Sequence, residues 1–359
     1  MLTPLGWGTL AGSLLLYLAG FLLGYPEPVV LATGGVLALV MALGWTAPRP
    51  KLEVSREVTP LKVPRGDAAV AVLQVRNLGR RGLSGLRAHD RIGGASHTVD
   101  VPRLPRHASR TVSYPLPTGV RGEIPVGPLR LIRADPLGLT RRVREYGGAA
   151  TLLVRPRTVA LPVPPSGKSH HLEGPTSDNA PSGTVTFHTL REYVIGDDLR
   201  HVHWKSSART GTLMVRQLID ASLPTTTVAL DTRALTELAV DAAASVAVAA
   251  ARAGFPVRVL TADGVLADTK SDADLILDRL ALVTPSEGDL AAPLRTTRAG
   301  GSLILVTASP DEATRLSALR RRFDRVICVY LGDGTPSPPS VTMAPIATLD
   351  ALPLTWSTR

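Results

Sequence analysis

A dense group of ionisable side chains lies between Arg191 and Gly211, in the stretch REYVIGDDLRHVHWKSSARTG. These 21 residues contain three arginines, three carboxylates, two histidines, one lysine and one tryptophan. Such residue types are compatible with acid–base or nucleophilic catalysis, with metal binding, or with recognition of a charged partner. The spacing of the residues is what separates these three possibilities.

A hydrolase would need a nucleophile and a base within reach of each other. His201 and His203 alternate along the chain, so on an extended segment both would point to one side, toward Ser206 or Ser207. The chain has no Gly-x-Ser-x-Gly turn here to position a serine. A hydrolase using His201, His203 or Ser207 is therefore kept as the alternative function. Asp198 with the two histidines is also a possible zinc set, but the spacing is generic.

A scaffold or a docking surface explains more of these residues. Gly196 and Asp197 are typical of a turn, and Asp197 or Asp198 can cap the segment after that turn. Each arginine can form a bidentate pair with a nearby carboxylate, and Trp204 would fix the segment on its domain. The arginines are Arg191, Arg200 and Arg209, and the carboxylates are Glu192, Asp197 and Asp198. Because arginine and tryptophan dominate interface hot spots, a partner could instead read the same face.

The elements that position this stretch begin with two apolar runs. Leu5–Leu23 carries no charge, and Val29–Trp45 follows after the break Gly-Tyr-Pro-Glu-Pro. A spanning helix needs about 20 mostly apolar residues. The runs predict a transmembrane hairpin over residues 1–46. The alternative is a cleaved signal peptide and one anchor, but Met-Leu-Thr-Pro lacks the basic residues that precede a signal peptide's apolar core.

The net charge of +10 predicts how the hairpin is oriented. Residues 46–146 contain 19 Lys and Arg against 8 Asp and Glu, an excess of 11, whereas residues 147–359 have 21 of each. Because basic residues next to a span stay inside, we expect the plasma (inner) membrane, with both termini and the soluble domains cytoplasmic. A basic block beside a membrane favours anionic lipid over nucleic acid. It also contains only two aromatic residues, Tyr114 and Tyr146, so it lacks a base-stacking platform, and we expect no nucleic-acid partner.

Beyond the hairpin, residues 50–160 alternate with a period of two that is typical of strands. Strands are predicted over residues 68–79, 95–104, 108–119, 121–138 and 150–161, and RNLGRRG at 76–82 resembles a hairpin turn. This pattern predicts a small β-sandwich-like domain. Residues 161–190 are rich in Pro, Gly and Ser and predict a linker or long loop. His170 and His171 within it have no matching ligand spacing, so we expect no metal there.

In the C-terminal half, apolar strands alternate with helices. The predicted strands are 225–233, 255–264, 301–310 and 325–334, and the predicted helices are 234–253, 271–283 and 311–323. This order predicts an α/β domain over residues 191–335 with a mostly parallel sheet covered on both faces. The single cysteine, Cys328, lies in the apolar run RVICVYL and is predicted to be a buried hydrophobic residue. Residues 336–359, which include TPSPPS, are predicted to be a tail.

Three features of the chain resemble a membrane-anchored member of the domain of unknown function 58 family (DUF 58). RGEIPVGPLRLIRADPLGL is similar to its Arg-Gly, Gly-Pro and Asp-Pro-x-Gly-Leu elements, REYVIGDDLRHVHWKSSARTGTLMVRQ is similar to its core signature, and paired N-terminal helices are the third feature. Together these features reach to about Arg233. The matching signature residues are Arg191, Tyr193, Gly196, Asp197, Asp198, Arg200, Trp204, Ser207, Ala208 and Arg209.

The resemblance implies a bacterial membrane protein whose C-terminal domain is like a von Willebrand factor A domain. It also implies a functional link to a MoxR-type AAA+ ATPase and often to a transglutaminase-like membrane protein, and it leaves the biochemical activity open. Von Willebrand A domains commonly hold Mg²⁺ through an Asp-x-Ser-x-Ser loop. Here the loop is Asp231-Thr232-Arg233-Ala234-Leu235, so both serines are replaced.

An arginine at this position supplies a fixed positive charge and can pair with Asp231 directly. Hard cations need several converging oxygens, and only Asp231, Thr307 and, less directly, Asp311 remain. We therefore expect neither a metal nor a cofactor. The sequence favours a non-enzymatic, membrane-tethered adaptor or assembly protein over a hydrolase. A basic module that binds nucleic acid or anionic lipid is the third interpretation.

Overall fold

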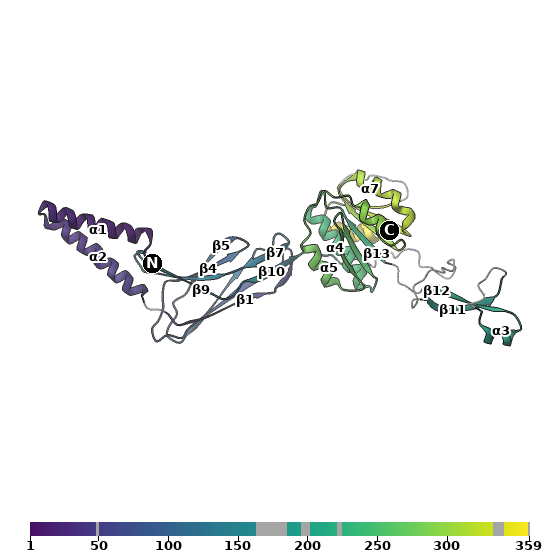
Figure 1. Cartoon of the computed structure of the whole chain (residues 1–359), viewed down its shortest axis with the longest axis horizontal. Coiled ribbons are helices and arrows are strands. Elements are labelled where there is room, and N and C mark those ends of the chain that lie inside the picture. Colours follow the sequence, from purple (N-terminus) through teal and green to yellow (C-terminus); the bar gives the residue numbers. More distant parts are fainter. Residues whose placement is uncertain (48–49, 163–184, 195–201, 221–224, 333–340, 358–359) are drawn as a thin grey trace. The chain divides into compact units, whose positions relative to one another are not determined.

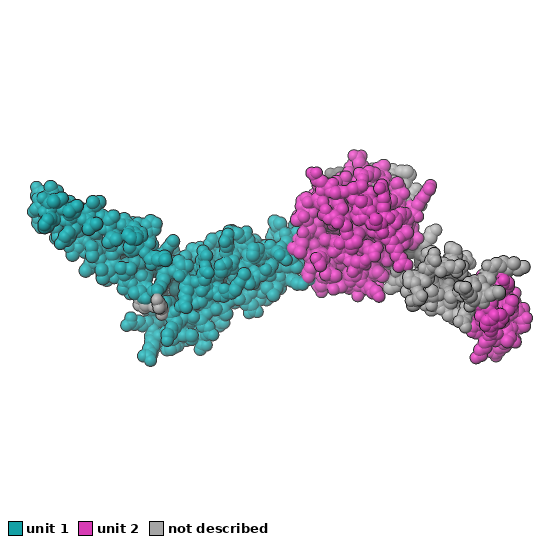
Figure 2. Space-filling model, viewed as in Figure 1, with its two compact units in different colours: residues 1–155 teal, residues 156–359 magenta. Residues whose placement is uncertain are grey.

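The computed structural model describes residues 1–47, 50–162, 185–194, 202–220, 225–332 and 341–357 (Figure 1). The chain divides into two compact units, Met1–Arg155 and Pro156–Arg359 (Figure 2). The first contains the apolar helices and a β-domain. The second contains a mixed α/β sheet and a separate two-stranded hairpin.

Two apolar helices, α1 (Pro4–Leu23) and α2 (Pro26–Thr46), open the chain. Both are long and apolar enough, by length and composition, to cross a membrane. They pack closely where one of them has a glycine: a Cβ on Gly20 would lie 2.6 Å from Val29 Cγ2, and one on Gly35 would collide with Ser13 Oγ. Small residues of this kind let apolar helices approach each other. The predicted pair of helices is confirmed.

Two β-sheets facing one core make up the rest of the first unit. One sheet is antiparallel in the order β1 (Leu52–Thr59), β3 (Val70–Asn77) and β6 (Ser109–Pro115). The other has the order β2 (Lys62–Pro64), β10 (Ala150–Arg155), β7 (Gly122–Val126), β4 (Leu86–Ile92), β8 (Leu129–Ala134) and β9 (Arg141–Tyr146), with β5 (Ala95–Val101) paired to β4. Inward side chains of both sheets, such as Leu73 and Leu129, form one hydrophobic cluster. The predicted β-rich region is confirmed.

The predicted hairpin turn at residues 76–82 is wrong, because β3 and β4 belong to different sheets. The chain crosses between the sheets here, and the buried Asn77 side chain holds the crossing. Its amide donates to the carbonyls of Arg81 (2.8 Å) and Pro105 (3.1 Å), and its oxygen accepts from the Gly79 N–H (2.9 Å). An asparagine that bonds locally to the backbone can therefore mimic a hairpin signal.

A buried ion pair joins the two sheets. Arg56 of β1 donates from Nη1 to both Asp90 carboxylate oxygens, at 2.9 and 3.2 Å, and the two side chains are only 4% and 1% exposed. The Tyr114 hydroxyl of β6 also donates to Asp90. Burial, reinforced by Asp90, raises the pKa of Tyr114. These polar partners explain why β1 and β4, which carry charge at inward positions, are strands that alternation of apolar residues did not predict.

The loop between β8 and β9, residues 135–140, attaches the helices to the β-domain. Thr3 donates from its N–H to the Leu139 carbonyl (2.9 Å) and from its hydroxyl to the Gly138 carbonyl (2.6 Å). Gly6 is so close to Leu139 that a Cβ would collide with the Leu139 carbonyl oxygen. On α2, the Thr46 hydroxyl lies 3.0 Å from the Thr140 hydroxyl. Both helices therefore hold the same loop.

Asp135 organises this loop from within. Its carboxylate accepts from the Thr140 N–H, from the Thr140 hydroxyl (2.9 Å) and from the Leu137 N–H (2.9 Å). Burial alone would raise the pKa of Asp135, but these bonds, with one from the Leu139 N–H, outweigh it and hold the pKa below its ordinary value. The Thr140 hydroxyl also contacts the Ala42 carbonyl of α2 at 3.1 Å.

The second unit contains a six-stranded sheet in the order β15-β14-β13-β16-β17-β18. All neighbours are parallel except β14 and β15. The strands are β13 (Thr226–Leu230), β14 (Val257–Thr261), β15 (Gly264–Thr269), β16 (Ser302–Thr307), β17 (Arg325–Leu331) and β18 (Thr342–Ile346). The predicted mostly parallel sheet is confirmed.

Helices cover both faces of this sheet. The helices are α4 (Glu237–Arg252), α5 (Ala273–Ala281), α6 (Ala291–Thr296), α7 (Pro310–Ser317) and α8 (Leu352–Ser357). Side chains of α4, α5 and α8 share one cluster with Val228 and Ile304, and those of α6 and α7 share another with Ala229 and Cys328. Most residues of the Ala-rich α4 are buried.

The predicted tail at 336–359 is wrong for its described part. β18 extends the sheet next to β17, and Trp356 of α8 is 5% exposed in the core. Prolines around residue 336 suggested a disordered end, but the apolar residues that follow complete one face of the domain. Most of the predicted linker, residues 163–184, lies outside the described residues, and so do His170 and His171.

Replacing Asp90 by Ala should leave the Arg56 guanidinium buried without its carboxylate. Removing one partner of a buried pair costs about 3–5 kcal/mol, so local stability of the β-domain should fall by about that amount. Hydrogen–deuterium exchange of β4 peptides in the detergent-solubilised chain measures it. The matched control is Asp100→Ala, which breaks a surface ion pair. The Asp100 side chain is 82% exposed and that of its partner Arg87 is 66% exposed. An equal effect of the control would contradict the role of the buried pair.

Asp135→Asn should weaken the attachment of the helices at neutral pH by about 2 kcal/mol, since hydrogen bonds to a charged group are the strong ones. A depressed pKa contributes stability above the ordinary value near about 3.9, and this contribution is lost as the pH falls through the lower folded value. The difference between variant and unchanged chain should therefore be present at pH 7 and shrink in strong acid. Thermal unfolding followed by circular dichroism at pH 7 and in strong acid tests this. The control is Asp100→Asn, which changes an exposed carboxylate.

Candidate functional site

The signature residues that the structure describes lie on or beside a two-stranded hairpin and the short helix between its strands. β11 (Val185–Glu192) pairs antiparallel with β12 (Met214–Asp220), and α3 (Trp204–Thr210) lies between them in sequence. The Tyr193 N–H donates to the Leu213 carbonyl at 2.7 Å, and the His203 N–H donates to the Met214 carbonyl at 2.8 Å. β11 begins inside the region predicted as a linker, so the linker boundary at residue 190 is wrong.

His203 is the N-cap of α3. His203 Nδ1 accepts from the Ser206 N–H at 3.2 Å and lies 2.7 Å from the Ser206 hydroxyl. The imidazole thus takes the place of the Ser or Thr side chain that usually caps the first turn of a helix, while the His203 N–H donates to Met214. The His203 ring therefore contacts Ser206, whereas Ser207 has a different set of partners.

Ser207 fastens α3 to β12. Its hydroxyl donates to the His203 carbonyl (3.2 Å) and accepts from the Met214 N–H (2.8 Å), and the residue is buried. A serine that satisfies two backbone groups in this way is committed to the joint between helix and strand. Gly211, with φ of 77°, then ends the helix in the left-handed conformation.

Several predicted site residues lie outside the described residues. These are Gly196, Asp197, Asp198, Arg200 and His201. The predicted turn, the zinc set and the pairing of Arg200 therefore fall outside the description. Arg191 donates from Nη1 to the backbone carbonyl of Glu192 at 3.2 Å. Ala208 and Arg209 are exposed on α3.

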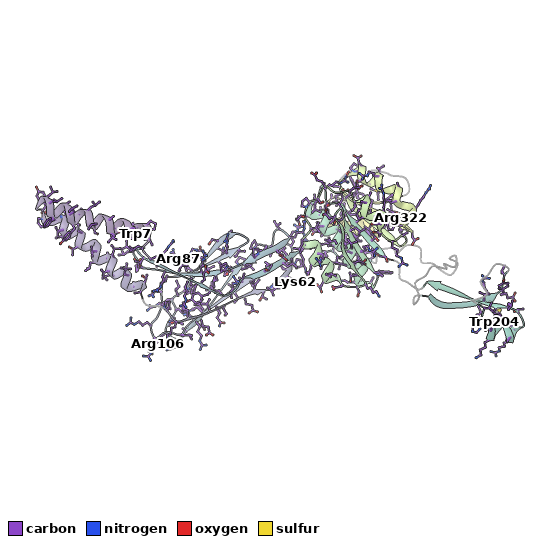
Figure 3. The ribbon with its side chains drawn as sticks, in the orientation of Figure 1. Trp7, Lys62, Arg87, Arg106, Trp204 and Arg322 are labelled. Atoms are coloured by element: carbon purple, nitrogen blue, oxygen red, sulfur yellow. The ribbon has the colours of Figure 1, made fainter. Side chains whose placement is uncertain are left out.

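Trp204, which the scaffold interpretation expects to fix the segment on its domain, is 66% exposed. It is the first residue of α3, and Ser207 is the residue of this helix that is buried. Figure 3 labels Trp204 on α3. Two further apolar residues, Val194 and Leu213, are 62% and 41% exposed, and Lys205 and Arg209 are exposed as well. We call these five residues the hairpin tip.

A second group of polar residues lies at the carboxyl end of the parallel sheet. Asp231 follows β13 and Thr307 ends β16, and these strands are neighbours whose connections lead to opposite sides. Ligands of such sheets bind where the strand order reverses in this way. Here the Thr307 hydroxyl donates to Asp231 Oδ2 at 2.8 Å. The predicted positions of Asp231 and Thr307 at the strand ends are confirmed.

Arg233 occupies this strand end. Its Nε donates to Asp231 Oδ1 at 3.2 Å, and its Nη2 lies 2.5 Å from Glu312 Oε2. The hydrogen bond to Asp231, followed by that to Glu312, raises the pKa of Arg233 above its usual value. Arg315 extends the chain of charges by contacting Glu312 at 3.6 Å and Asp289 at 2.6 Å. The predicted direct pairing of Arg233 with Asp231 is confirmed.

Sequence reasoning named Asp311 as the remaining acidic residue, but the residue that contacts Arg233 is its neighbour Glu312. The Glu312 side chain is 2% exposed and that of Asp231 is 4% exposed. Burial separates the two residues, because Glu312 is buried on α7 whereas Asp311 is exposed. Among the described residues, no three His, Cys, Asp or Glu side chains form a group that could hold a metal ion.

Arg233→Ala should leave the buried Asp231 carboxylate without its guanidinium partner and Glu312 with only the longer contact to Arg315, at a cost of about 3 kcal/mol or more. Cys328 reports this loss, because it is the single cysteine, is fully buried in β17, and has a pKa raised to about 12 by burial. Alkylation of Cys328 under native conditions should become about a hundredfold faster, since about 1.4 kcal/mol is a factor of ten. The control Arg258→Ala, which breaks the partly exposed pair with Asp268, should change the rate by less than about fivefold.

Part of the chain matches the model of a protein family. Residues 189–265 match the model described as "Protein of unknown function DUF58". The match covers the hairpin tip, Arg233 and the elements from β13 to β14. A comparison with the curated proteins finds no match.

Among solved structures, the CARDB domain of PF1109 from Pyrococcus furiosus is similar at 16% identity, covering 29% of this chain and 94% of that one, with a TM-score of 0.23. A domain of a putative cell surface protein from Methanosarcina acetivorans is similar at 18% identity, covering 30% of this chain and 93% of that one, with a TM-score of 0.22. Residues 189–265, which match the DUF58 model, include the signature hairpin and the strand end with Asp231 and Arg233.

Proposed function

We propose that this protein is a non-enzymatic adaptor or assembly protein, tethered to the plasma membrane, whose cytoplasmic domains bind a protein partner. The observation that carries the proposal is the hairpin tip, where Trp204, Val194 and Leu213 are exposed beside Lys205 and Arg209. Tryptophan and arginine dominate binding hot spots, and exposed apolar side chains rimmed by charge mark interaction sites.

The tether is supported by the contacts of the first helix. Thr3 and Gly6 of the α1 region hold the loop at residues 135–140, and Thr46 of α2 reaches the same loop. A cleaved signal peptide would lose the first set of contacts, so these contacts favour a retained hairpin. The excess of basic residues in the β-domain, together with the positive-inside tendency, favours a cytoplasmic location for both ends of the hairpin and for the domains.

The role without catalysis is supported by how the polar residues are used. Ser207 satisfies two backbone groups, His203 caps a helix, and Arg233 fills the strand end where a cation would bind in a von Willebrand factor A-like domain. The parallel sheet between two layers of helices fits a domain of that class. Such a protein acts by holding a partner at the membrane.

The partner we propose is a MoxR-type AAA+ ATPase, and a transglutaminase-like membrane protein is the second choice; both come from the resemblance to the DUF 58 family. The signature region supports this choice because its exposed residues are the ones that a partner could reach. The family match at residues 189–265 covers them.

Trp204→Ala should weaken binding of a MoxR-type ATPase from the same genome by at least about 2 kcal/mol, or about thirtyfold, as expected of a hot spot. Binding is measured by surface plasmon resonance with the full chain in nanodiscs. Trp204→Phe should retain most of the affinity. The matched control is Val265→Ala, a residue of β15 that is 60% exposed and far from the hairpin in sequence.

Equal affinities for the Trp204 and Val265 variants would contradict the docking role. A hydrolytic activity of the purified chain that is lost on changing His203 or Ser207 would instead establish the alternative function. Far-UV circular dichroism of each variant separates lost binding from lost folding.

A further inference from the structure

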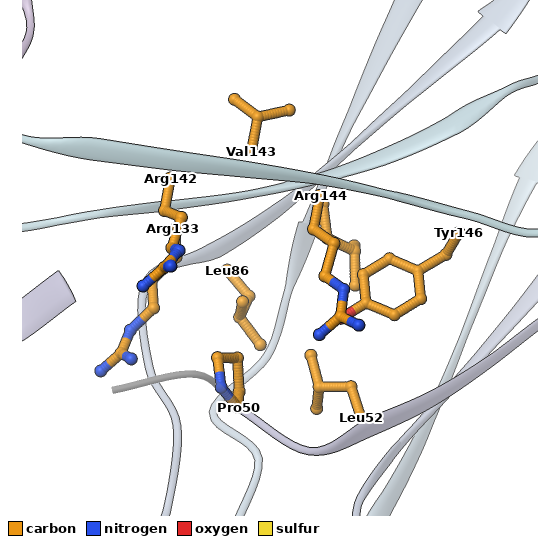
Figure 4. Close-up of a pocket in the computed structure, with 9 residues that line it drawn as sticks. Pro50, Leu52, Leu86, Arg133, Arg142, Val143, Arg144 and Tyr146 are labelled. Atoms are coloured by element: carbon orange, nitrogen blue, oxygen red, sulfur yellow. The ribbon is translucent and has the colours of Figure 1, made fainter. Parts of the chain in front are cut away.

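A cavity of about 310 Å³ opens at the end of the β-domain that adjoins α2 (Figure 4). Its volume falls in the range of about 300–1,000 Å³ that is usual for small-molecule sites. Its residues divide into two kinds, arginines and apolar side chains. The arginines are Arg133, Arg142 and Arg144, and the apolar residues are Pro50, Leu52, Leu86, Leu131, Val143 and Tyr146.

The arginines come from adjacent strands, so their positions are fixed by the ladder. Arg133 of β8 pairs directly with Arg142 of β9, and Leu131 of β8 pairs with Arg144. The Arg144 guanidinium lies 5.4 Å from the centre of the Tyr146 ring, and Figure 4 shows the two side chains together. Like charges directly opposite each other are destabilising. An anion between them would remove that cost.

Arg142 also connects the cavity to the membrane helix. Its Nη1 donates to the Ala47 carbonyl at 2.9 Å, just after the last residue of α2. A positive charge at a helix C-terminus is favourable, so this contact fixes the end of α2 beside the cavity. Burial lowers the pKa of the Arg133 guanidinium below its usual value, as expected where a cation is partly removed from water.

A second cavity, of about 780 Å³, shares Pro50 and Arg133 with the first. Gly44 and Trp45 of α2 line it. Its cationic residues are Lys51, Arg80, Arg81, Arg103 and Arg133, and none of the described residues lining either cavity is acidic. Two adjoining hollows with cationic walls and no carboxylate among these residues select against cations and for a negatively charged ligand.

The position of these cavities identifies the source of the anion. α2 ends at Thr46, and Pro50 and Lys51 follow within a few residues. The polar layer of a bilayer is about 5–8 Å deep on each side, so residues directly after a spanning helix lie at the level of lipid phosphates. Trp45 has the amphipathic ring that prefers this level. Leucines near Arg144 and Arg142 suit the glycerol and first methylenes of a lipid, which a free phosphate lacks.

We propose that the cavity lined by Arg133, Arg142 and Arg144 binds the headgroup of an anionic phospholipid in the leaflet next to the β-domain. The phosphate contacts the guanidiniums, and the glycerol backbone packs on Leu52, Leu86 and Leu131. The inference rests on α1 and α2 spanning the membrane, and it is independent of which protein partner binds the hairpin tip.

Native mass spectrometry of the detergent-purified full chain, titrated with phosphatidylglycerol or with phosphatidylcholine of the same acyl chains, tests the proposal. Phosphatidylglycerol should bind at least about tenfold more tightly. One arginine near a membrane surface contributes about fivefold to binding of anionic lipid, so Arg144→Gln should weaken phosphatidylglycerol binding by about that factor. Its binding of phosphatidylcholine should not change.

The matched control is Arg110→Gln, an exposed arginine of β6 that lines neither cavity. It should change the affinity for phosphatidylglycerol by less than about twofold. An equal loss in both variants would show diffuse attraction by net charge and would overturn the site. Equal binding of the two lipids by the unchanged chain would overturn it without any variant.

Glycerol 3-phosphate, which has the phosphate but no acyl chains, separates a lipid from a soluble ligand. It should not displace phosphatidylglycerol at equal concentration. If it binds the lipid-free chain as tightly as phosphatidylglycerol does, the ligand is a soluble phosphorylated compound and the proposal is wrong.

Discussion

The first unit depends on the Asp135 carboxylate. It shapes the loop at residues 135–140 by accepting hydrogen bonds from Thr140 and from backbone N–H groups nearby. In that conformation the Leu139 and Gly138 carbonyls face Thr3, and the Thr140 hydroxyl faces α2. A charged acceptor is strong enough to fix such a loop, whereas an isolated neutral bond is worth about 1 kcal/mol. The segment Asp-Pro-Leu-Gly-Leu at residues 135–139 is thus part of the attachment point of the two apolar helices.

Paired arginines have a similar role in each folded domain. Arg56 joins the two sheets of the β-domain through Asp90, and Arg233 joins β13 to α7 through Asp231 and Glu312. Each removes a carboxylate from water, and each such pair specifies which elements meet more than it adds stability. At the sheet end the guanidinium of Arg233 bridges the two buried carboxylates, so one residue sets both the packing and the local charge of that end.

Periodicity in the sequence was sufficient for the elements whose burial is purely apolar. The two membrane-length helices, the strands β13, β14, β16 and β17, and the helix α4 were all predictable from runs of apolar residues. It was insufficient where polar groups are buried with partners distant in sequence. Asp90 of β4 is buried in a pair with Arg56, which is 34 residues away in sequence. The Asn77 side chain holds the crossing between the two sheets, although the sequence around it resembles a hairpin turn.

For the candidate sites, the sequence predicted the pairing of Arg233 with Asp231, because the two are neighbours in one loop. It could not predict that Trp204 is exposed, since a tryptophan in a charged segment is equally compatible with an anchor and with a contact surface. Nor could it reveal the cavity beside α2, whose arginines come together through the register of β8 and β9. Such groupings of side chains depend on which strands pair and in which register, and the local spacing of residues in the sequence does not reveal this.

The loop at residues 135–140 connects β8 to β9, and these are the strands that carry the cavity's arginines. Both helices hold this loop by short contacts, and Gly6 leaves no slack between α1 and the Leu139 carbonyl. A bilayer that changes the tilt or separation of the helices would therefore pull on both strands at once. If α1 and α2 span the bilayer as proposed, membrane thickness would be coupled through this loop to the spacing of the guanidiniums, and lipid would act on the cavity through geometry as well as charge.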